Sequence, residues 1–272
     1  MKSKSLIICH IKNCDYPLWR RWLDKHYNFF DEVIIYWSDH FRHMYYDKFI
    51  EDSLKHIPNI KFLPFQPYEY GVADWRNVAT NRMLDVAKGE WIISIEQDFF
   101  CRDWNRLLGA ITEASKTYDF LGYKGYQGQT GYQDYLTGNY VHPSFFFMKR
   151  ETLEKTSKDF TAETSKGCDH FGLITQDAER MRIPIWYTQD NGFLEEEAFH
   201  LGGVNQNYLE GLKPEYVFHR PDWFYIYNYW CRKADVPQSP LFTKISLEVE
   251  ERLKKMFPDI DPQADNRSIF FK

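Results

Sequence analysis

Short apolar runs alternate with amphipathic stretches along the first hundred residues of the chain. Each run ends in polar or turn-forming residues, which is typical of buried strands. The runs predict strands at residues 6–10, 32–37, 60–63 and 90–95. The stretches between them predict helices that begin at Pro17 and that cover residues 45–56 and 74–88, the last one capped by Gly89. Strands that alternate with helices indicate a parallel sheet with crossover helices.

The pattern changes after about residue 118. A helix at 104–117 ends the alternation, and the segment 123–140, rich in Gly, Gln and Tyr, favours loops or irregular hairpins. Further apolar and amphipathic segments predict strands at 144–148 and 185–188 and helices at 151–158, 175–182 and 245–256.

Charge and cysteine content narrow the classes of protein to which the chain can belong. The formal net charge is −5 and the pI is about 6.0, a balance that disfavours binding along nucleic-acid backbones. The five cysteines form no CxxC pair, so we expect reduced thiols and a cytoplasmic location. No apolar run approaches the roughly 18 residues of a membrane span, and the N-terminal run predicts a strand rather than a signal peptide.

An acidic triplet at residues 96–98, Glu-Gln-Asp, directly follows the predicted strand 90–95. In open α/β sheets, ligands bind just beyond the carboxyl ends of the strands. Carboxylates two residues apart can together hold a ribose and a hard divalent cation such as Mg²⁺ or Mn²⁺. Because acidic triplets are common, a solvated strand end is the competing interpretation.

The stretch from Trp75 to Asp98 resembles the central signature of family 2 glycosyltransferases. In that family an Arg-Asn helix, an Ala-x-Gly-Glu turn and an apolar strand lead to an Asp-x-Asp triplet. Here Asn81, the turn 87–90 and the triplet at 96–98 stand at these places, with Glu instead of Asp as the first acid. The resemblance implies a GT-A type α/β fold, in which helices flank a Rossmann-like, mostly parallel sheet. It also implies a nucleoside-diphosphate sugar as donor, with a UDP-sugar favoured.

The same resemblance extends over residues 5 to about 204 and implies the organisation of the chain. Residues 1–208 form the glycosyltransferase domain, with a nucleotide-sugar-binding half at 1–118 and an acceptor half at 119–208. Residues 209–272 form a helical or irregular C-terminal extension that packs on this domain.

The resemblance assigns donor-binding roles to Asp39, Arg76, Asn81, Glu96 and Asp98. Asp39 contacts the base or the ribose, and Arg76 meets the diphosphate; the alternatives are turn capping and plain solvation. The resemblance further implies that Asp98 ligates a divalent metal, Mn²⁺ or Mg²⁺, together with His200, which opens a His-x-Gly-Gly motif. A carboxylate and an imidazole suit Mn²⁺. His219 is the competing imidazole.

Two aspartates, Asp177 and Asp169, are candidates for the general base. In the family an acidic pair at the start of a helix removes the proton of the acceptor hydroxyl, and the sugar is transferred with inversion at the anomeric carbon. An N-terminal helix position keeps such a carboxylate ionised. Helix capping is the alternative for Asp177, and Gln176 stands where the family has Glu.

Three other functions stay open from the sequence. A glycosyltransferase that modifies hydroxymethylated bases of phage DNA is one, although the acidic balance speaks against it. A nucleotidyltransferase shares the nucleotide-binding half, but the loop 10–14 has no glycine. A non-catalytic carbohydrate- or nucleotide-binding protein would use the same scaffold. The expected acceptor is accordingly a glycan, a lipid-linked sugar or a modified nucleobase.

Overall fold

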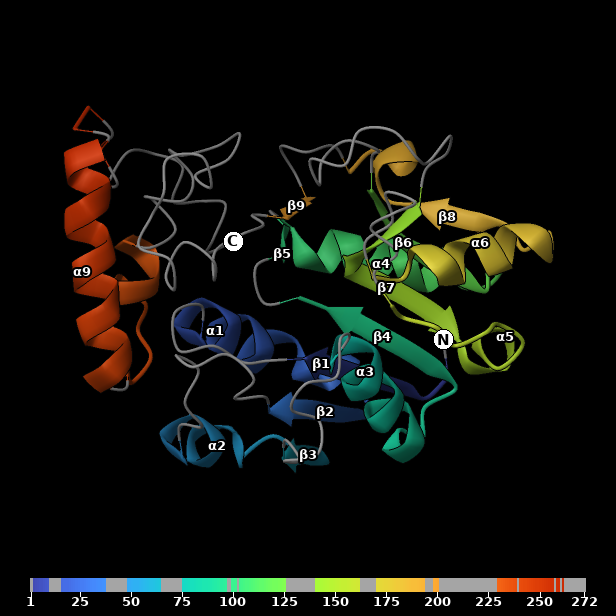
Figure 1. Cartoon of the computed structure of the whole chain (residues 1–272), viewed down its shortest axis with the longest axis horizontal. Helices are drawn as coiled ribbons and strands as arrows, with labels where there is room; N and C mark the ends of the chain where they lie inside the picture. Colours follow the sequence, from blue (N-terminus) through green and yellow to red (C-terminus); the bar gives the residue numbers. More distant parts are fainter. Residues whose placement is uncertain are drawn as a thin grey trace.

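Four parallel strands form one half of the central sheet in the computed structural model of the protein (Figure 1). They pair in the order β3-β2-β1-β4, and they are β1 (Lys4–Cys9), β2 (Glu32–Trp37), β3 (Ile60–Pro64) and β4 (Trp91–Ile95). The four strands predicted from the first hundred residues are therefore confirmed. The structure describes residues 2–9, 16–37, 48–64, 75–96, 99–101, 103–125, 140–161, 170–193, 198–200, 229–238, 240–256, 258–259 and 261.

An antiparallel strand, β7 (Tyr140–Lys149), joins this half to the rest of the seven-stranded sheet. It pairs with β4 on one side and with β6 (Phe120–Gly125) on the other. The last strand, β8 (Ile185–Tyr187), runs parallel to β6. The sheet is thus parallel except at β7, which faces an antiparallel neighbour on both sides.

Of the loops or irregular hairpins predicted at 123–140, the hairpin fits the structure, because residues 123–125 belong to β6, which pairs antiparallel with β7. β7 begins four residues before the predicted strand at 144–148. The sequence pattern did not predict β6 as a strand because of its glycines. A Cβ at Gly122 would overlap a methyl group of Val141 and lie 2.9 Å from the carbonyl oxygen of Phe145. Glycine is therefore needed for close approach of the strands and does not end β6.

Helices cover both faces of the sheet (Figure 1). One face packs against α1 (Tyr16–His26), α2 (Lys48–Leu54) and α4 (Trp104–Ala114). The other face packs against α3 (Trp75–Val86), α5 (Arg150–Leu153) and α6 (Gly172–Arg180). Alternate residues of β1 divide between the two cores, since Leu6 and Ile8 join the first and Ile7 joins the second. The three layers are those that the strand–helix alternation predicts.

Smaller elements lie outside these layers. β5 (Phe99–Cys101) and β9 (Ala198–His200) form a separate two-stranded antiparallel sheet. Short 3-10 helices follow α1 and β8, namely η1 (Tyr27–Phe29) and η4 (Gln189–Asn191). The sequence analysis predicted neither β5 nor the early end of α5, which stops at Leu153 instead of residue 158.

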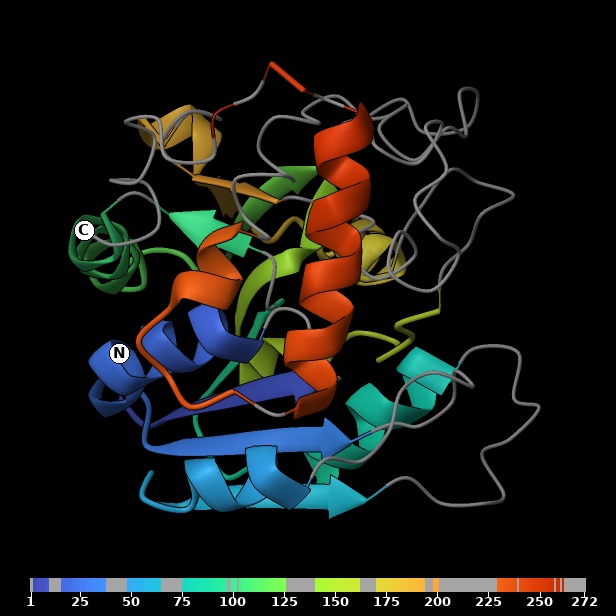
Figure 2. The ribbon, with the colours of Figure 1, turned by 90° about the vertical axis from the view of Figure 1, so that its left-hand side faces the viewer.

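The C-terminal part contains a helical segment at 229–233 and the long helix α9 (Pro240–Met256). An ion pair between Arg232 and Glu250 joins them. In Figure 2, α9 stands in front of the sheet, and in Figure 1 it lies on the side toward which β2 points. The predicted helix 245–256 is confirmed, with an earlier start. Among the described helices, none combines the length and the apolar character that crossing a bilayer requires.

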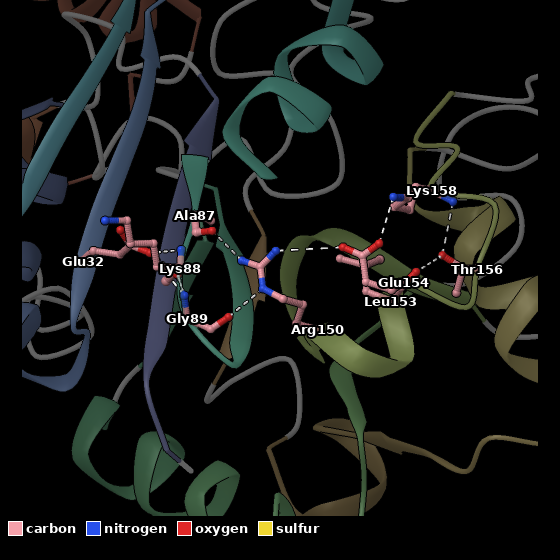
Figure 3. Close-up of polar contacts among 10 residues, drawn as sticks. Glu32, Ala87, Lys88, Gly89, Arg150, Leu153, Glu154, Thr156 and Lys158 are labelled. Atoms are coloured by element: carbon pink, nitrogen blue, oxygen red, sulfur yellow. Dashed lines mark hydrogen bonds and ion pairs between the residues drawn. The ribbon is translucent and has the colours of Figure 1, made fainter. Parts of the chain in front are cut away.

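The turn between α3 and β4 is held from two sides (Figure 3). The carboxylate of Glu32 accepts hydrogen bonds from the backbone nitrogens of Lys88 and Gly89, the latter at 3.2 Å. The guanidinium of Arg150 donates to the carbonyl oxygens of Ala87 at 2.8 Å and Gly89 at 2.9 Å. A buried carboxylate from β2 and an arginine at the start of α5 thereby fix the point at which the chain enters β4.

Gly89 is required by close contact, and its predicted role as a helix cap is wrong because α3 ends at Val86. The backbone nitrogen of Gly89 donates to the hydroxyl of Ser5 at 2.7 Å. A Cβ at this position would lie 2.5 Å from the backbone nitrogen of Ser5 and still closer to its Oγ. The turn therefore packs directly onto β1.

Substitution Gly89→Ala is expected to lower the free energy of unfolding by about 2 kcal/mol, because the added methyl group overlaps the backbone of Ser5. Gly109→Ala in α4 is the matched control, since a Cβ there meets no described atom within 4 Å. That control is expected to raise stability by about 0.5–1 kcal/mol through helix propensity. Urea denaturation measures both, and equal effects at the two glycines would contradict the close contact.

Acid is expected to remove the stabilisation that Glu32 provides. Burial raises the pKa of its carboxyl, but hydrogen bonds from Lys61, Ser5 and Lys88 outweigh burial, so the pKa lies below its ordinary value of 4.5. A carboxyl whose pKa is lowered by folding stabilises the protein above its unfolded pKa and ceases to do so as the pH falls through the folded pKa. Glu32→Gln should therefore cost about 2 kcal/mol at pH 7 and progressively less below about pH 4.5. A cost that is the same at pH 7 and pH 3 in urea denaturation would refute this.

Candidate functional site

The carboxyl ends of the parallel strands define the candidate site. β2 and β3 lie on one side of β1 and β4 lies on the other, so the strand order reverses between β1 and β4. The position beyond such a reversal is where open α/β sheets bind ligands. Because β7 runs antiparallel to β4, its amino end joins this edge, and the backbone nitrogen of Glu96 donates to the carbonyl oxygen of Ser144 at 3.0 Å.

Two predicted donor-binding residues, Arg76 and Glu96, contact each other at this edge. Arg76 lies in the first turn of α3, and Glu96 directly follows β4. The guanidinium nitrogen Nη1 of Arg76 lies 2.8 Å from Oε1 of Glu96, and the two side chains are 23% and 18% exposed. The structure thus brings together the residues expected to meet the diphosphate and the ribose, and it holds them as a partly buried ion pair.

The pairing of β5 with β9 places His200 opposite the residue that follows the other predicted metal ligand, Asp98, in the sequence. Phe99, the first residue of β5, is the register partner of His200 at the end of β9. Asp98, which precedes Phe99 in the sequence, lies outside the described residues. Residues separated by a hundred positions in the sequence are therefore neighbours along one short ladder.

Several other predicted site residues lie outside the part of the chain that the structure describes. Asp39, Asp169 and His219 belong to this group together with Asp98. Their roles stay predictions. Within the described ranges, no group of three or more His, Cys, Asp or Glu side chains is arranged to hold a metal ion.

Asn81 lies farther along α3, where its side-chain amide has partners within the protein. The amide nitrogen donates to Oδ1 of Asn77 at 3.0 Å and to the carbonyl oxygen of Lys158 at 3.3 Å. Oδ1 of Asn77 also accepts from the backbone nitrogen of Phe160 at 3.1 Å. The two asparagines join α3 to the segment that follows α5, and donor binding by Asn81 stays a prediction.

The expected position of Asp177 at the start of a helix is wrong, because α6 begins at Gly172 and Asp177 lies in its second half. Its Oδ2 accepts hydrogen bonds from the backbone nitrogen of Ser157 at 2.8 Å and from the Ser157 hydroxyl at 2.6 Å. Its Oδ1 lies 3.2 Å from Arg180. The carboxylate therefore ties α6 to the end of the turn after α5, and its role as a base stays a prediction.

The same edge carries polar side chains that the sequence analysis did not single out. His142 lies near the start of β7, and Lys124 lies near the end of β6. The side-chain amide of Gln189 accepts a hydrogen bond from the backbone nitrogen of Lys124 at 2.8 Å and donates one to its carbonyl oxygen at 2.9 Å. Nζ of Lys124 lies 2.5 Å from the carboxylate of Asp190. Lys124 was missed because 123–140 was assigned to loops or irregular hairpins, and His142 was missed because it precedes the predicted strand at 144–148. A histidine followed by proline in an otherwise apolar strand was the available signal.

Tyr187 at the end of β8 completes this polar group. Its burial, and then the nearby carboxylates of Glu179 and Asp190, raise the pKa of its hydroxyl far above the ordinary value. The phenol therefore keeps its proton at neutral pH and can donate a hydrogen bond. The ammonium group of Lys124 lies 5.1 Å from the centre of its ring, within the range of a cation–π contact.

Comparison with solved structures shows which fold this is. Mannosyltransferase PcManGT from Pyrobaculum calidifontis, solved in complex with GDP-Man and Mn²⁺, matches with a TM-score of 0.50 at 15% sequence identity, over 92% of this chain and 69% of that chain. The match shows the fold, so the GT-A type α/β class implied by the sequence resemblance is confirmed.

Two further structures match with lower scores. TarS of S. aureus matches with a TM-score of 0.45 at 14% identity, over 94% of this chain and 72% of that one. Glucosyl-3-phosphoglycerate synthase of Mycobacterium tuberculosis matches with a TM-score of 0.45 at 12% identity, over 68% of this chain and 69% of that one. No protein-family model matches the sequence, and no curated protein matches it significantly.

The ion pair at the site edge is expected to couple its two residues energetically. In a double-mutant cycle, Arg76→Ala and Glu96→Ala should be non-additive by about 1 kcal/mol in the free energy of unfolding, because both side chains are largely buried. The exposed pair of Lys116 and Glu113, 2.6 Å apart, is the control and should couple by less than about 0.5 kcal/mol. Equal coupling in the two cycles would contradict a specific contact at the site.

Proposed function

We propose that this protein is a glycosyltransferase, which moves a sugar from a nucleoside-diphosphate sugar to an acceptor hydroxyl. The observation that carries the proposal is the register of β5 and β9, with Phe99 opposite His200 just beyond the end of β4. This register supports a site shared by His200 and Asp98. The GT-A type fold and the ion pair of Arg76 with Glu96 at the same sheet edge support it further.

The proposed donor site lies in the half of the domain at 1–118. Its residues are Asp39, Arg76, Asn81, Glu96 and Asp98. Arg76 supports the assignment most directly, because a guanidinium in the first turn of a helix suits a diphosphate, which helix N-termini also attract. The sequence resemblance favours UDP as the nucleotide, and the structure of the Pyrobaculum calidifontis mannosyltransferase contains GDP-Man, so both bases belong in the test.

A divalent metal, Mn²⁺ or Mg²⁺, would be held by Asp98 and His200. The ligand types fit, since a carboxylate and an imidazole suit Mn²⁺, and the β5–β9 register sets His200 opposite Phe99, the residue that follows Asp98 in the sequence, which supports the pairing. When bound, such a metal stabilises the negative charge that develops on the leaving diphosphate. Arg76 adds a positive charge at the same edge.

Of the two candidate bases, we infer that Asp169 acts on the acceptor. Asp177 is occupied by the hydrogen bonds from Ser157, which give it a structural role. Phe171, two residues after Asp169, has a φ of 70°, a conformation that is rare for a bulky residue. Backbone conformations of this kind cluster at active sites, which favours the segment just before α6 as the place of the base.

The proposed reaction then needs one proton transfer by the protein. Asp169 takes the proton of the acceptor hydroxyl while the hydroxyl oxygen attacks the anomeric carbon. The bond from that carbon to the diphosphate oxygen breaks on the opposite side, so the configuration inverts. The acceptor, a glycan, a lipid-linked sugar or a modified nucleobase, would bind in the half at 119–208, and the cysteine pattern supports a cytoplasmic location.

Donor hydrolysis and transfer, assayed with UDP- and GDP-sugars, should require Mn²⁺ or Mg²⁺. Asp98→Ala and His200→Ala are each expected to lower the rate by about 100-fold or more, because each removes a proposed metal ligand. Asp85→Ala, an exposed carboxylate on α3, is the control and should leave the rate unchanged. Full activity of Asp98→Ala without added metal would overturn the proposal.

The same assay separates the alternatives. Asp169→Asn should lower transfer by about 100-fold, whereas Asp177→Asn should mainly lower the melting temperature. Donor binding without turnover by the wild type would indicate a non-catalytic binding protein. Transfer to hydroxymethylated duplex DNA and not to glycans would identify a nucleobase as the acceptor.

A further inference from the structure

An irregular stretch of β7 lies beside Glu96 and has no part in the mechanism described above. The register between β6 and β7 shifts there, so that Tyr123 alone stands opposite residues 142–145. Bulges bend a strand and re-aim its side chains, and they are common next to active sites. Pro143, which has no N–H to donate to a ladder, lies within this bulge.

The bulge turns the imidazole of His142 onto Ser144. The backbone nitrogen of Ser144 donates to Nδ1 of His142 at 3.2 Å, and the Ser144 hydroxyl lies 2.8 Å from the same atom. A backbone N–H can only donate, so Nδ1 carries no proton, the hydroxyl donates to it as well, and the ring proton is on Nε2. Because the two residues are only 7% and 0% exposed, removing this acceptor would leave two donors without water to replace it.

Ser144 links this buried contact to the candidate donor site. Its carbonyl oxygen accepts from the backbone nitrogen of Glu96 at 3.0 Å, and the Glu96 carboxylate lies 2.8 Å from Arg76. The rings of Tyr123 and Tyr140 flank the imidazole, with centroids 6.3 Å and 6.1 Å from its own. A fixed ring, the main chain of the bulge and the first acid of the triplet are thus joined by successive hydrogen bonds.

We propose that His142 and Ser144 are positioning residues of the donor site, which hold the main chain at Glu96 in the place where its carboxylate pairs with Arg76. The imidazole acts as a fixed acceptor through Nδ1 and works through Ser144 without touching the substrate. The term donor site rests on the proposed function, whereas the support of Glu96 is a property of the fold and is testable separately.

Substitutions at His142 test whether its acceptor atom, and not its ring alone, supports the donor site. In His142→Asn, the side-chain Oδ1 lies near the position of Nδ1 and keeps an acceptor for Ser144. In His142→Gln, the side-chain amide reaches the position of Nε2 instead. His142→Phe keeps only a ring and has no acceptor. His26→Phe is the control, because His26 also packs among aromatic rings, 5.9 Å from Trp22 and 6.1 Å from Trp104, on a different helix. Ser144→Ala removes the hydroxyl donor and keeps the carbonyl oxygen that Glu96 uses.

Two measurements report the effect of each substitution. Amide hydrogen exchange at Glu96, followed by NMR, reports the support of the main chain, and calorimetric titration with UDP or GDP in the presence of Mn²⁺ reports the donor site. His142→Phe and His142→Gln should speed exchange and weaken nucleotide binding by about tenfold each, because they leave the Ser144 donors unpaired. His142→Asn and His26→Phe should stay within about threefold of the wild type, and Ser144→Ala should show a smaller change in the direction of His142→Phe.

Each of the other possible outcomes supports or overturns the positioning role. Wild-type exchange and wild-type affinity in His142→Phe would overturn the inference, as would rescue by glutamine instead of asparagine. If His142→Phe does not fold, the comparison of His142→Asn with His142→Gln carries the test. If the wild type binds neither UDP nor GDP, the proposed function fails, while the exchange rate at Glu96 still supports or refutes the positioning role.

Discussion

Hydrogen bonds along both sides of β4 hold the two halves of the protein together, and the placement of the site depends on them. On one side β4 continues the parallel sheet through β1, and on the other it pairs with the antiparallel strand β7. The carboxyl end of β4 and the bulged amino end of β7 therefore meet at one edge. Glu96 stands at this junction, bonded to Ser144 through its main chain and to Arg76 through its side chain.

The helix–strand unit that leads to this junction is fixed at its other end. Glu32 and Arg150 clamp the turn after α3, and Gly89 packs onto the backbone of β1. A carboxylate and a guanidinium thus hold the turn that joins α3, which carries Arg76, to β4, which leads to Glu96, and this is a structural reason for the Gly-Glu turn that the sequence shows.

The sequence predicted more of the first half than of the second, for physical reasons. β1, β2 and β4 are buried on both faces, so their apolar runs are unambiguous, and Glu96, the first acid of the triplet, directly follows β4 as expected. The sequence pattern did not predict β6, because its Gly122 allows close contact between strands and resembles a turn residue in the sequence. The pattern also misplaced the start of α6, because Phe171 precedes the helix in a left-handed conformation that no sequence rule anticipates. The ion pair at Glu96 and the contact of His142 with Ser144 depend on register across strands, which a single sequence does not encode locally.

The central claim is that Asp98 and His200 share one metal ion that is bound together with a nucleoside diphosphate. Electron paramagnetic resonance of Mn²⁺ tests it directly, because free Mn²⁺ gives a signal that bound Mn²⁺ loses. The account predicts that the wild type binds one Mn²⁺ in the presence of UDP or GDP, and that Asp98→Ala and His200→Ala each abolish this binding. Undiminished Mn²⁺ binding in both variants would contradict it.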